Sequence, residues 1–134
     1  MKKIFSINYT NWAFTLAMLL LRVSMGLLMI PHGYDKLVHF SKYSRDFMNF
    51  LGLGSTVSLA LVVFAEFFCA IFLIIGLFSR IVLIPLIIDV CVVLFIAHKA
   101  DFFGDGEHAA LFLAGYLTLL LCGPGKASVD GMTR

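Results

Sequence analysis

The stretch LALVVFAEFFCAIFLIIGL, residues 59–77, decides the fold, because it is long and apolar and carries one carboxylate, Glu66, near its middle. A helix rises about 1.5 Å per residue and the hydrocarbon core of a bilayer is about 30 Å thick, so a span needs about 20 mostly apolar residues. The run therefore predicts a membrane-spanning helix. Its carboxylate is the feature that a functional hypothesis has to explain.

The composition of the whole chain points the same way. Of the 134 residues, 61% are hydrophobic and only 13% are charged, and the mean hydropathy is +1.01. These values lie far outside the range of soluble globular domains. The net charge of +2 gives no indication of nucleic acid, so we expect no such partner. We expect one integral membrane domain, residues 1–134, whose main partner is the lipid bilayer.

Four apolar runs set the predicted topology, and they cover about residues 12–30, 55–77, 81–97 and 107–123. Backbone groups in lipid must find partners within their own segment, so runs of this length are helices. The predicted fold class is all-α: a bundle of four transmembrane helices. Between the first two runs, residues 31–54 place apolar side chains at helical spacing among charges, which predicts an amphipathic helix at the membrane interface.

An even number of spans puts both termini on one side of the membrane. Lysine and arginine are then divided almost equally between the two sides: Lys2, Lys3, Arg80, Lys126 and Arg134 on the terminal side, and Lys36, Lys42, Arg45 and Lys99 on the other. By this narrow margin the positive-inside rule favours cytoplasmic termini.

Three ionisable residues, Arg22, Glu66 and Asp89, fall deep inside predicted spans, each about 13–15 Å from a helix end. A charge at the bilayer centre costs about 2.5–3.5 kcal/mol on insertion scales, so we do not expect three of them to face lipid separately. They are predicted to meet in the bundle core, with Arg22 between the two carboxyl groups and one acid held protonated. A network that fixes helix register and does nothing more is the alternative.

Helical periodicity assigns neighbours to these residues. Arg22 shares its face with Met18, Met25, Gly26, Met29, Gly33 and Lys36. On the fourth predicted helix, Glu107, Ala110, Ala114 and Thr118 form a narrow stripe of mostly small residues, and Tyr116 lies on the opposite face. Which of these two faces is turned to the core stays open at this point.

A second group of polar residues lies at the membrane surface away from the termini. It contains all four histidines, His32, His39, His98 and His108, with Lys36, Lys99, Asp101 and Glu107 beside them. Such a location is typical of the mouth of a site that leads to the buried charges, and histidine can shuttle protons there. The histidines have no His-x-x-x-His spacing, so no metal site is expected. Solvated side chains or contacts with lipid headgroups are the alternative.

The predicted ligand site therefore combines the buried charges with this surface group: Arg22, Glu66, Asp89, His32, Lys36, His98, Glu107 and His108. The three cysteines form no Cys-x-x-Cys pair, and the chain carries no cofactor motif, so no covalent cofactor is expected.

Three stretches together resemble the DoxX family of small four-helix membrane proteins: LRVSMGLLMIPHGYDKL, AEFFCAIFLIIGLFSRI and GEHAALFLAGYLTLLLCGPGKASVD. The resemblance extends over about residues 16–130. It implies an integral bundle in the bacterial cytoplasmic membrane. The family is named for a subunit of a thiosulfate:quinone oxidoreductase, and relatives are linked to quinone or thiol stress. The family pattern maps onto Arg22, Gly26, His32, Gly33, Lys36, Glu66, Gly76, Arg80 and Glu107, whereas Asp89 has no firm match in it.

Three functions are compatible with these observations, because a fold of this kind does not fix function. The first is a redox-linked membrane subunit that binds a quinone against the methionines on the same helix face as Arg22. Arg22 would donate hydrogen bonds to the quinone, and Glu66 or Asp89 would transfer protons. A redox partner protein would supply the electrons. The second is a non-enzymatic transporter or binding module for a small, anionic solute with Arg22 as counter-ion. The third is a scaffold or chaperone that contacts other membrane proteins through its small-residue stripe. Whether the protein is an enzyme, and whether it forms a homo-oligomer, stays open.

Overall fold

The computed structural model describes residues 6–45, 52, 54–97, 99, 101, 103–104 and 106–133, and every regular element in these ranges is a helix. Three helical segments are long and apolar enough to cross a membrane: Asn11–Val38, Ser55–Ile75 and Ser79–Ile96. A fourth apolar helix, Glu107–Cys122, is shorter. The all-helical class is thus as predicted, with three candidate membrane spans and one shorter apolar helix.

The elements along the chain are α1 (Asn11–Val38), α2 (Phe40–Ser44), α3 (Ser55–Val63), η1 (Phe64–Cys69), α4 (Ala70–Ile75), α5 (Ser79–Val92), η2 (Val93–Ala97), α6 (Glu107–Cys122) and α7 (Val129–Met132). The segments α3, η1 and α4 follow one another without a break and form the second long helix. Its middle portion, η1, is a π-helix, and so is η2 at the end of the third long helix.

The first helix is longer than the apolar run that predicts it. It begins after Thr10, whose hydroxyl accepts a hydrogen bond from the Ala13 N–H at 3.2 Å. It then continues through Pro31 to Val38, beyond the predicted end at residue 30. Proline removes only one helical hydrogen bond, and the buried face of α1 continues past it to Gly33, so packing outweighs that loss.

The predicted interfacial helix is represented by a short helix only. α2 has five residues, none of them buried. The Tyr43 hydroxyl donates a 2.7 Å hydrogen bond to Oδ2 of Asp35 and so fastens α2 to the end of α1. Residues 46–51 and 53, over which the predicted helix would continue, lie outside the described residues.

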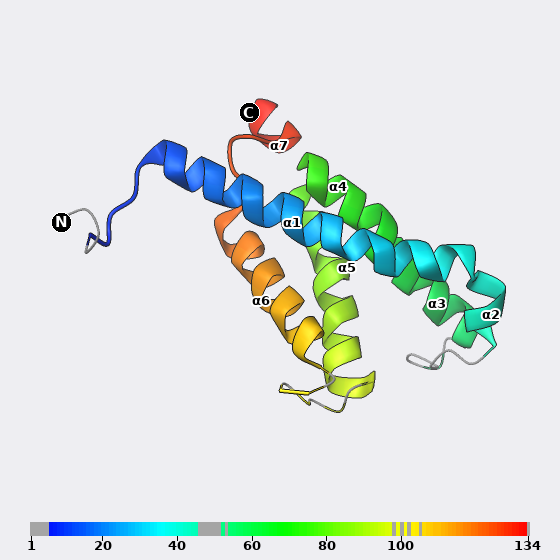
Figure 1. Ribbon diagram of the computed structural model, residues 1–134. Coiled ribbons are helices and arrows are strands. Elements are labelled where there is room, and N and C mark those ends of the chain that lie inside the picture. The colour runs from blue at the N-terminus through cyan, green and yellow to red at the C-terminus, as the bar shows by residue number, and fades with distance from the viewer. Residues whose placement is uncertain are drawn as a thin grey trace.

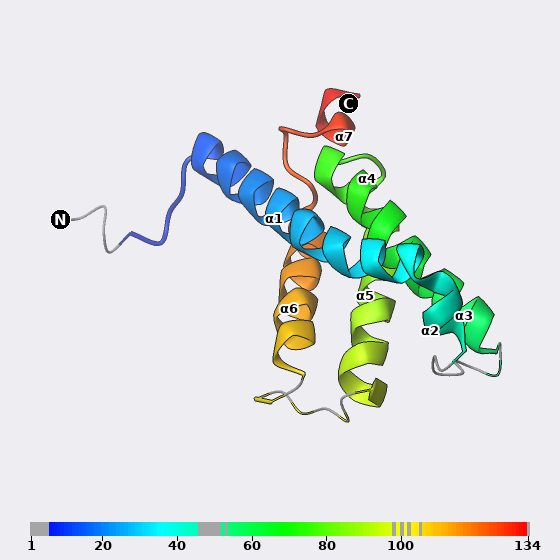
Figure 2. The same ribbon diagram turned by 45° about the vertical axis from the view of Figure 1, so that its right-hand side comes forward.

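The helices are arranged with α1 crossing the others (Figures 1 and 2). α1 packs along α3, η1 and α4, while α5 packs along α6, and η1 also contacts α5. The core between them is mainly aliphatic and includes Leu73, Leu83, Leu86, Leu119 and the ring of Tyr116. This crossing brings the middle of the second long helix, which carries Glu66, against both α1 and α5.

Two glycines allow α1 to lie directly on the second long helix. A Cβ atom on Gly33 would lie 2.6 Å from the carbonyl carbon of Glu66, and one on Gly26 would lie 2.9 Å from the carbonyl oxygen of Ala70. The backbones therefore approach more closely at these points than any side chain would permit. This contact fixes the height of Glu66 relative to α1.

The end of α4 and the start of α5 are held by the C-terminal segment. Gly76 and Phe78 adopt left-handed φ angles of 76° and 51°, which turn the chain sharply. The Asp130 carboxylate accepts hydrogen bonds from the N–H groups of Phe78 and Ser79 at 2.9 and 2.8 Å, and so caps α5. Accordingly α7 lies beside the end of α4 in both ribbon views.

Candidate functional site

An ion pair between α1 and η1 is the first component of the site. Lys36 Nζ donates a hydrogen bond to Glu66 Oε1 at 2.7 Å. The Glu66 side chain is only 4% exposed and that of Lys36 is 24% exposed. The charge of the embedded glutamate is thus compensated by a lysine from the end of the first helix, which answers why a carboxylate is tolerated there.

The direction in which side chains leave a helix explains this pairing. Cα–Cβ bonds tilt toward the N-terminus of their own helix, and α1 and the second long helix run in opposite directions. Lys36 therefore points back along α1, while Glu66 points toward the α3 end, and the two meet. Glu66 also lies in the wider turn of a π-helix, a geometry that is frequent at functional sites.

Asp89 on α5 is the second component. It is 6% exposed, lies beside the carboxyl group of Glu66 and within electrostatic range of Lys36, and accepts no hydrogen bond from an N–H or O–H donor on either carboxyl oxygen. Tyr116 on α6 is completely buried, interacts electrostatically with the same two carboxyl groups, and has an unpartnered hydroxyl. Buried polar groups are nearly always hydrogen-bonded, so an unsatisfied acid and an unsatisfied phenol close together call for an explanation.

A cavity of about 370 Å³ opens at this point. Half of its lining residues can carry charge, namely His32, Lys36, Glu66, Asp89 and His108. The other half are apolar, namely Met29, Val90, Val93, Ala109 and Phe112. The exposed residues His32 and His108 form the outer part, and the two buried acids form the inner part.

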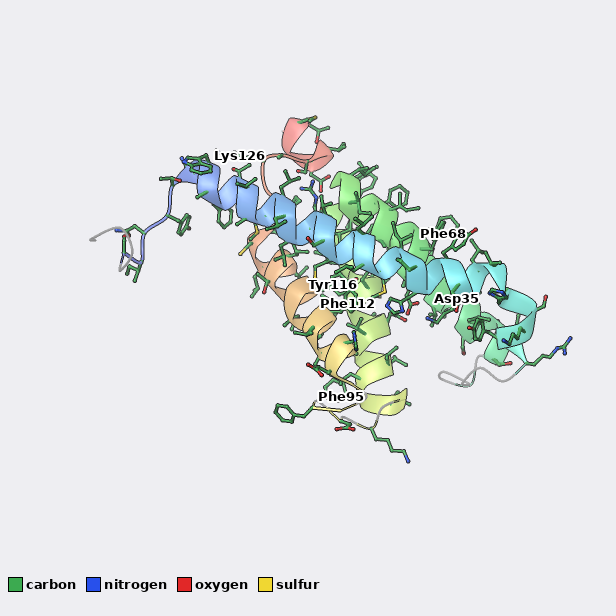
Figure 3. All side chains as sticks on the ribbon, in the orientation of Figure 1. Asp35, Phe68, Phe95, Phe112, Tyr116 and Lys126 are labelled. Atoms are coloured by element: carbon green, nitrogen blue, oxygen red, sulfur yellow. The ribbon has the colours of Figure 1, made fainter. Side chains whose placement is uncertain are left out.

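The rings of Phe112 and His32 belong to the cavity lining. Phe112 stacks on Tyr116 with ring centroids 5.8 Å apart, and His32 meets the edge of Phe112 at 6.2 Å. Figure 3 labels Phe112 and Tyr116 in the region where α1 crosses α5 and α6. A planar molecule in the cavity would therefore meet both apolar side chains and groups that can carry a proton.

The structure corrects the prediction for Arg22. Its guanidinium group is buried but donates to three carbonyl oxygens, those of Ile74 at 3.3 Å, Pro124 at 2.7 Å and Ala127 at 2.9 Å. It therefore does not lie between Glu66 and Asp89, and it does not line their cavity. The depth of each residue in the membrane was counted along the helices, which places the Cα atoms but takes no account of side-chain direction. Arg22 points toward the end of the molecule that holds the C-terminal segment, and Glu66 points toward the opposite end.

The remaining predicted residues divide as follows. His32, Lys36 and His108 line the cavity with the two acids, and the sequence did not indicate the pairing of Lys36 with Glu66. Glu107 is exposed in the first turn of α6 and lies outside the cavity lining. His98 lies outside the described residues. His39 is exposed and pairs with Oδ1 of Asp35 at 3.2 Å.

The open question about the last helix is answered by burial. The buried residues of α6 are Ala109, Gly115, Tyr116 and Leu119. Tyr116 therefore faces the core, whereas Ala114 and Thr118 of the small-residue stripe are exposed. Over the described ranges no three His, Cys, Asp or Glu side chains come together as a metal site requires.

The long apolar helices and the cavity with buried charged residues show the class of protein: a helical membrane protein with a polar internal cavity. The family model DoxX matches residues 17–99, which is more than half of the chain. The protein belongs to the DoxX family, and the resemblance seen in the sequence is confirmed. No curated protein and no solved structure matches the chain.

Proposed function

We propose that this DoxX-family protein is a redox-linked subunit of the bacterial cytoplasmic membrane that binds a quinone headgroup in the cavity between α1, η1, α5 and α6. In this proposal α6 completes a four-helix membrane domain formed by the whole chain, and both termini lie in the cytoplasm. The single observation that carries the proposal is the buried carboxyl group of Asp89 at the inner end of the cavity, which lies beside Glu66 and accepts no hydrogen bond from an N–H or O–H donor.

The charge balance of the site suggests how Asp89 acts. If Lys36, Glu66 and Asp89 all ionised, one negative charge would remain without a partner in a low-dielectric interior. Glu66 already has the lysine as its partner, so the neutral form is favoured for Asp89. A neutral carboxylic acid in an apolar site can donate a hydrogen bond to a ligand carbonyl. Tyr116, which is completely buried and lies outside the cavity lining, would donate its unpartnered hydroxyl to the acid and so hold it in place.

The size and walls of the cavity fit a small planar carbonyl compound. Its volume of about 370 Å³ lies within the range of about 300–1,000 Å³ that is usual for small-molecule sites. Met29, Val90 and Phe112 would pack against the ring, and the donor groups would bind its oxygens. A quinone has this combination of a flat ring and two carbonyl acceptors.

The redox step requires a partner. Conversion of a quinone to its quinol consumes two electrons and two protons and forms an O–H bond at each oxygen. The family resemblance suggests that an associated redox protein supplies the electrons. Asp89 would donate a proton to the nearer oxygen, and His32 and His108 would return protons to it from the aqueous phase. The second proton would reach the outer oxygen through the same histidines.

Binding of a short-chain quinone to the purified protein tests the proposal, measured by calorimetry in detergent and by native mass spectrometry for co-purified quinone. We expect Asp89→Leu, which removes the donor, to weaken binding about tenfold, because the loss of one buried hydrogen bond between neutral groups costs up to about 1.5 kcal/mol. Asp89→Asn should stay within about threefold, because an amide can still donate. Glu107→Gln, a change at an exposed carboxylate outside the cavity, is the matched control.

Equal binding by Asp89→Leu and the native protein would refute this role of Asp89. Binding of a redox-inactive solute in place of the quinone would favour the non-enzymatic module. In that case an anion would have to compete with Glu66 for Lys36, because the donors of Arg22 are already bound to carbonyl oxygens.

A further inference from the structure

A second and larger cavity, of about 420 Å³, lies at the terminal end of the molecule, away from the acids. Its walls come from the start of α1, the turn between α4 and α5, and the chain that follows α6. None of its lining residues is shared with the first cavity. We propose that this terminal cavity binds the phosphate group of an anionic phospholipid.

The basic side chains of Arg80 and Lys126 line the cavity and are exposed. The guanidinium group of Arg80 lies over Gly123, where an added Cβ atom would be 3.3 Å from Nη2, so the glycine makes room for it. Arginine binds phosphate oxygens through two N–H groups, and lysine adds a point charge. These two residues give the cavity the charge that a phosphate needs.

The acidic residue in the lining does not cancel this charge. Both carboxylate oxygens of Asp130 accept hydrogen bonds from backbone N–H groups of the turn before α5, and Arg22 lies within its electrostatic range. Arg22, Arg80 and Lys126 together outweigh the single carboxylate. The local field at the terminal cavity is therefore positive.

A buried hydroxyl in the wall of the cavity is an independent indication of a ligand. Ser79 lines the cavity, is only 1% exposed, and has an Oγ atom without a hydrogen-bond partner. A serine hydroxyl can donate to a phosphate oxygen, which would satisfy this group. Its neighbour Arg80 would bind the same phosphate from the rim.

The position of the cavity favours a lipid over a soluble phosphate. The apolar helices α5 and α6 begin and end at its walls, which is the level of the lipid headgroups. Two large apolar side chains of the lining, Phe78 and Ile81, are 59% and 67% exposed and would contact acyl chains. Basic pockets between transmembrane helices are known to hold anionic headgroups.

The backbone around the cavity is fixed before any ligand arrives. Arg22 binds the carbonyl oxygens of Pro124 and Ala127, and the Ser128 hydroxyl bonds to Gly125 O at 2.7 Å. A preformed wall lowers the entropic cost of binding.

The test compares nanodiscs of phosphatidylcholine with nanodiscs that also contain phosphatidylglycerol, using native mass spectrometry for retained lipid and thermal unfolding for stability. We expect selective retention of phosphatidylglycerol and a higher Tm in its presence. Each of Arg80→Gln and Lys126→Gln should weaken retention about fivefold, the effect of about 1 kcal/mol per basic residue at a membrane surface. Lys42→Gln, which removes an exposed lysine on α2, is the charge-matched control and should change nothing.

Inorganic phosphate added to phosphatidylcholine nanodiscs separates a lipid from a free anion. The proposal expects little stabilisation by phosphate alone. Stabilisation by phosphate equal to that by phosphatidylglycerol, without retained lipid, would overturn the assignment to a lipid. Undiminished lipid retention by Lys126→Gln, whose exposed side chain is not needed for folding, would overturn the site itself.

Discussion

The molecule holds two buried polar clusters that look equivalent in the sequence and differ in one physical respect. Around Arg22, all three donor nitrogens bind carbonyl oxygens. Around Glu66, one ion pair is formed, and the neighbouring carboxyl group of Asp89 accepts no hydrogen bond from an N–H or O–H donor although it lies beside a cavity. A satisfied buried charge stabilises a fold, whereas an unsatisfied one next to a cavity has capacity left for a ligand.

Replacing Arg22 should produce the largest effect on stability. Arg22→Met leaves three carbonyl oxygens without their charged donor, and we expect the free energy of unfolding to fall by about 3–5 kcal/mol. Thermal unfolding in detergent measures the loss, and limited proteolysis should show cleavage after α6 first. Arg22→Lys can still donate to one or two of these oxygens, so its free energy of unfolding should lie between those of Arg22→Met and the native protein. An unchanged Tm for Arg22→Met would show that the cluster is not structural.

Gly33 tests the close contact that sets the height of Glu66. A Cβ atom there would meet backbone atoms of Glu66 and Phe67 at 2.6–2.8 Å, and backbone cannot rotate away. We expect Gly33→Ala to lower the free energy of unfolding by about 2–3 kcal/mol and to weaken quinone binding by shifting the ion pair. Leu28→Ala, at an exposed position of α1, is the control and should have little effect. Native stability of Gly33→Ala would contradict the helix contact described here.

Glu66→Gln tests whether the ion pair contributes to stability, to quinone binding or to both. The substitution leaves Lys36 without its partner, and we expect a loss of about 1–3 kcal/mol in stability, because the lysine is partly exposed. In the double variant with Lys36→Met the stability should recover, since no unpaired charge remains. Quinone binding should fall in Glu66→Gln, because Asp89 is then the acid left beside Lys36 and its ionised form cannot donate a hydrogen bond. Unchanged binding in Glu66→Gln would show that the pair serves the fold alone.

Changes on the outward face of α6 should have the smallest effect. Glu107 and Thr118 are exposed, and the Thr118 hydroxyl donates only to Ala114 O of its own helix at 2.8 Å. We expect Glu107→Gln and Thr118→Ala to alter the free energy of unfolding by less than about 0.5 kcal/mol, with unchanged quinone binding. A large loss of binding at Glu107 would extend the site beyond the cavity lining.

Much of the fold could be predicted from the sequence because it follows from hydrophobicity and helical period. The buried face of α1 is the predicted one and includes Met18, Gly26, Met29 and Gly33. Grouping Glu66, Asp89, Lys36 and two histidines around one site was likewise possible, since charges avoid lipid.

The partners of individual charges could not be predicted. The acceptors of Arg22 are backbone carbonyl oxygens 52, 102 and 105 residues away in the sequence, and every residue offers such a group. The π-helix around Glu66 also has no signal in the apolar pattern. A depth count treats side chains as points at their Cα atoms, although Arg22 and Glu66 leave antiparallel helices in opposite directions. Including that direction would have paired Glu66 with Lys36.

Infrared difference spectroscopy on the purified protein, with and without a short-chain quinone, tests the central claim that Asp89 is a neutral acid that binds the ligand. The account predicts that quinone shifts the carbonyl stretch of a protonated carboxylic acid, and that this band is missing in Asp89→Asn. A spectrum without such a band, or a band that persists in Asp89→Asn, would contradict it.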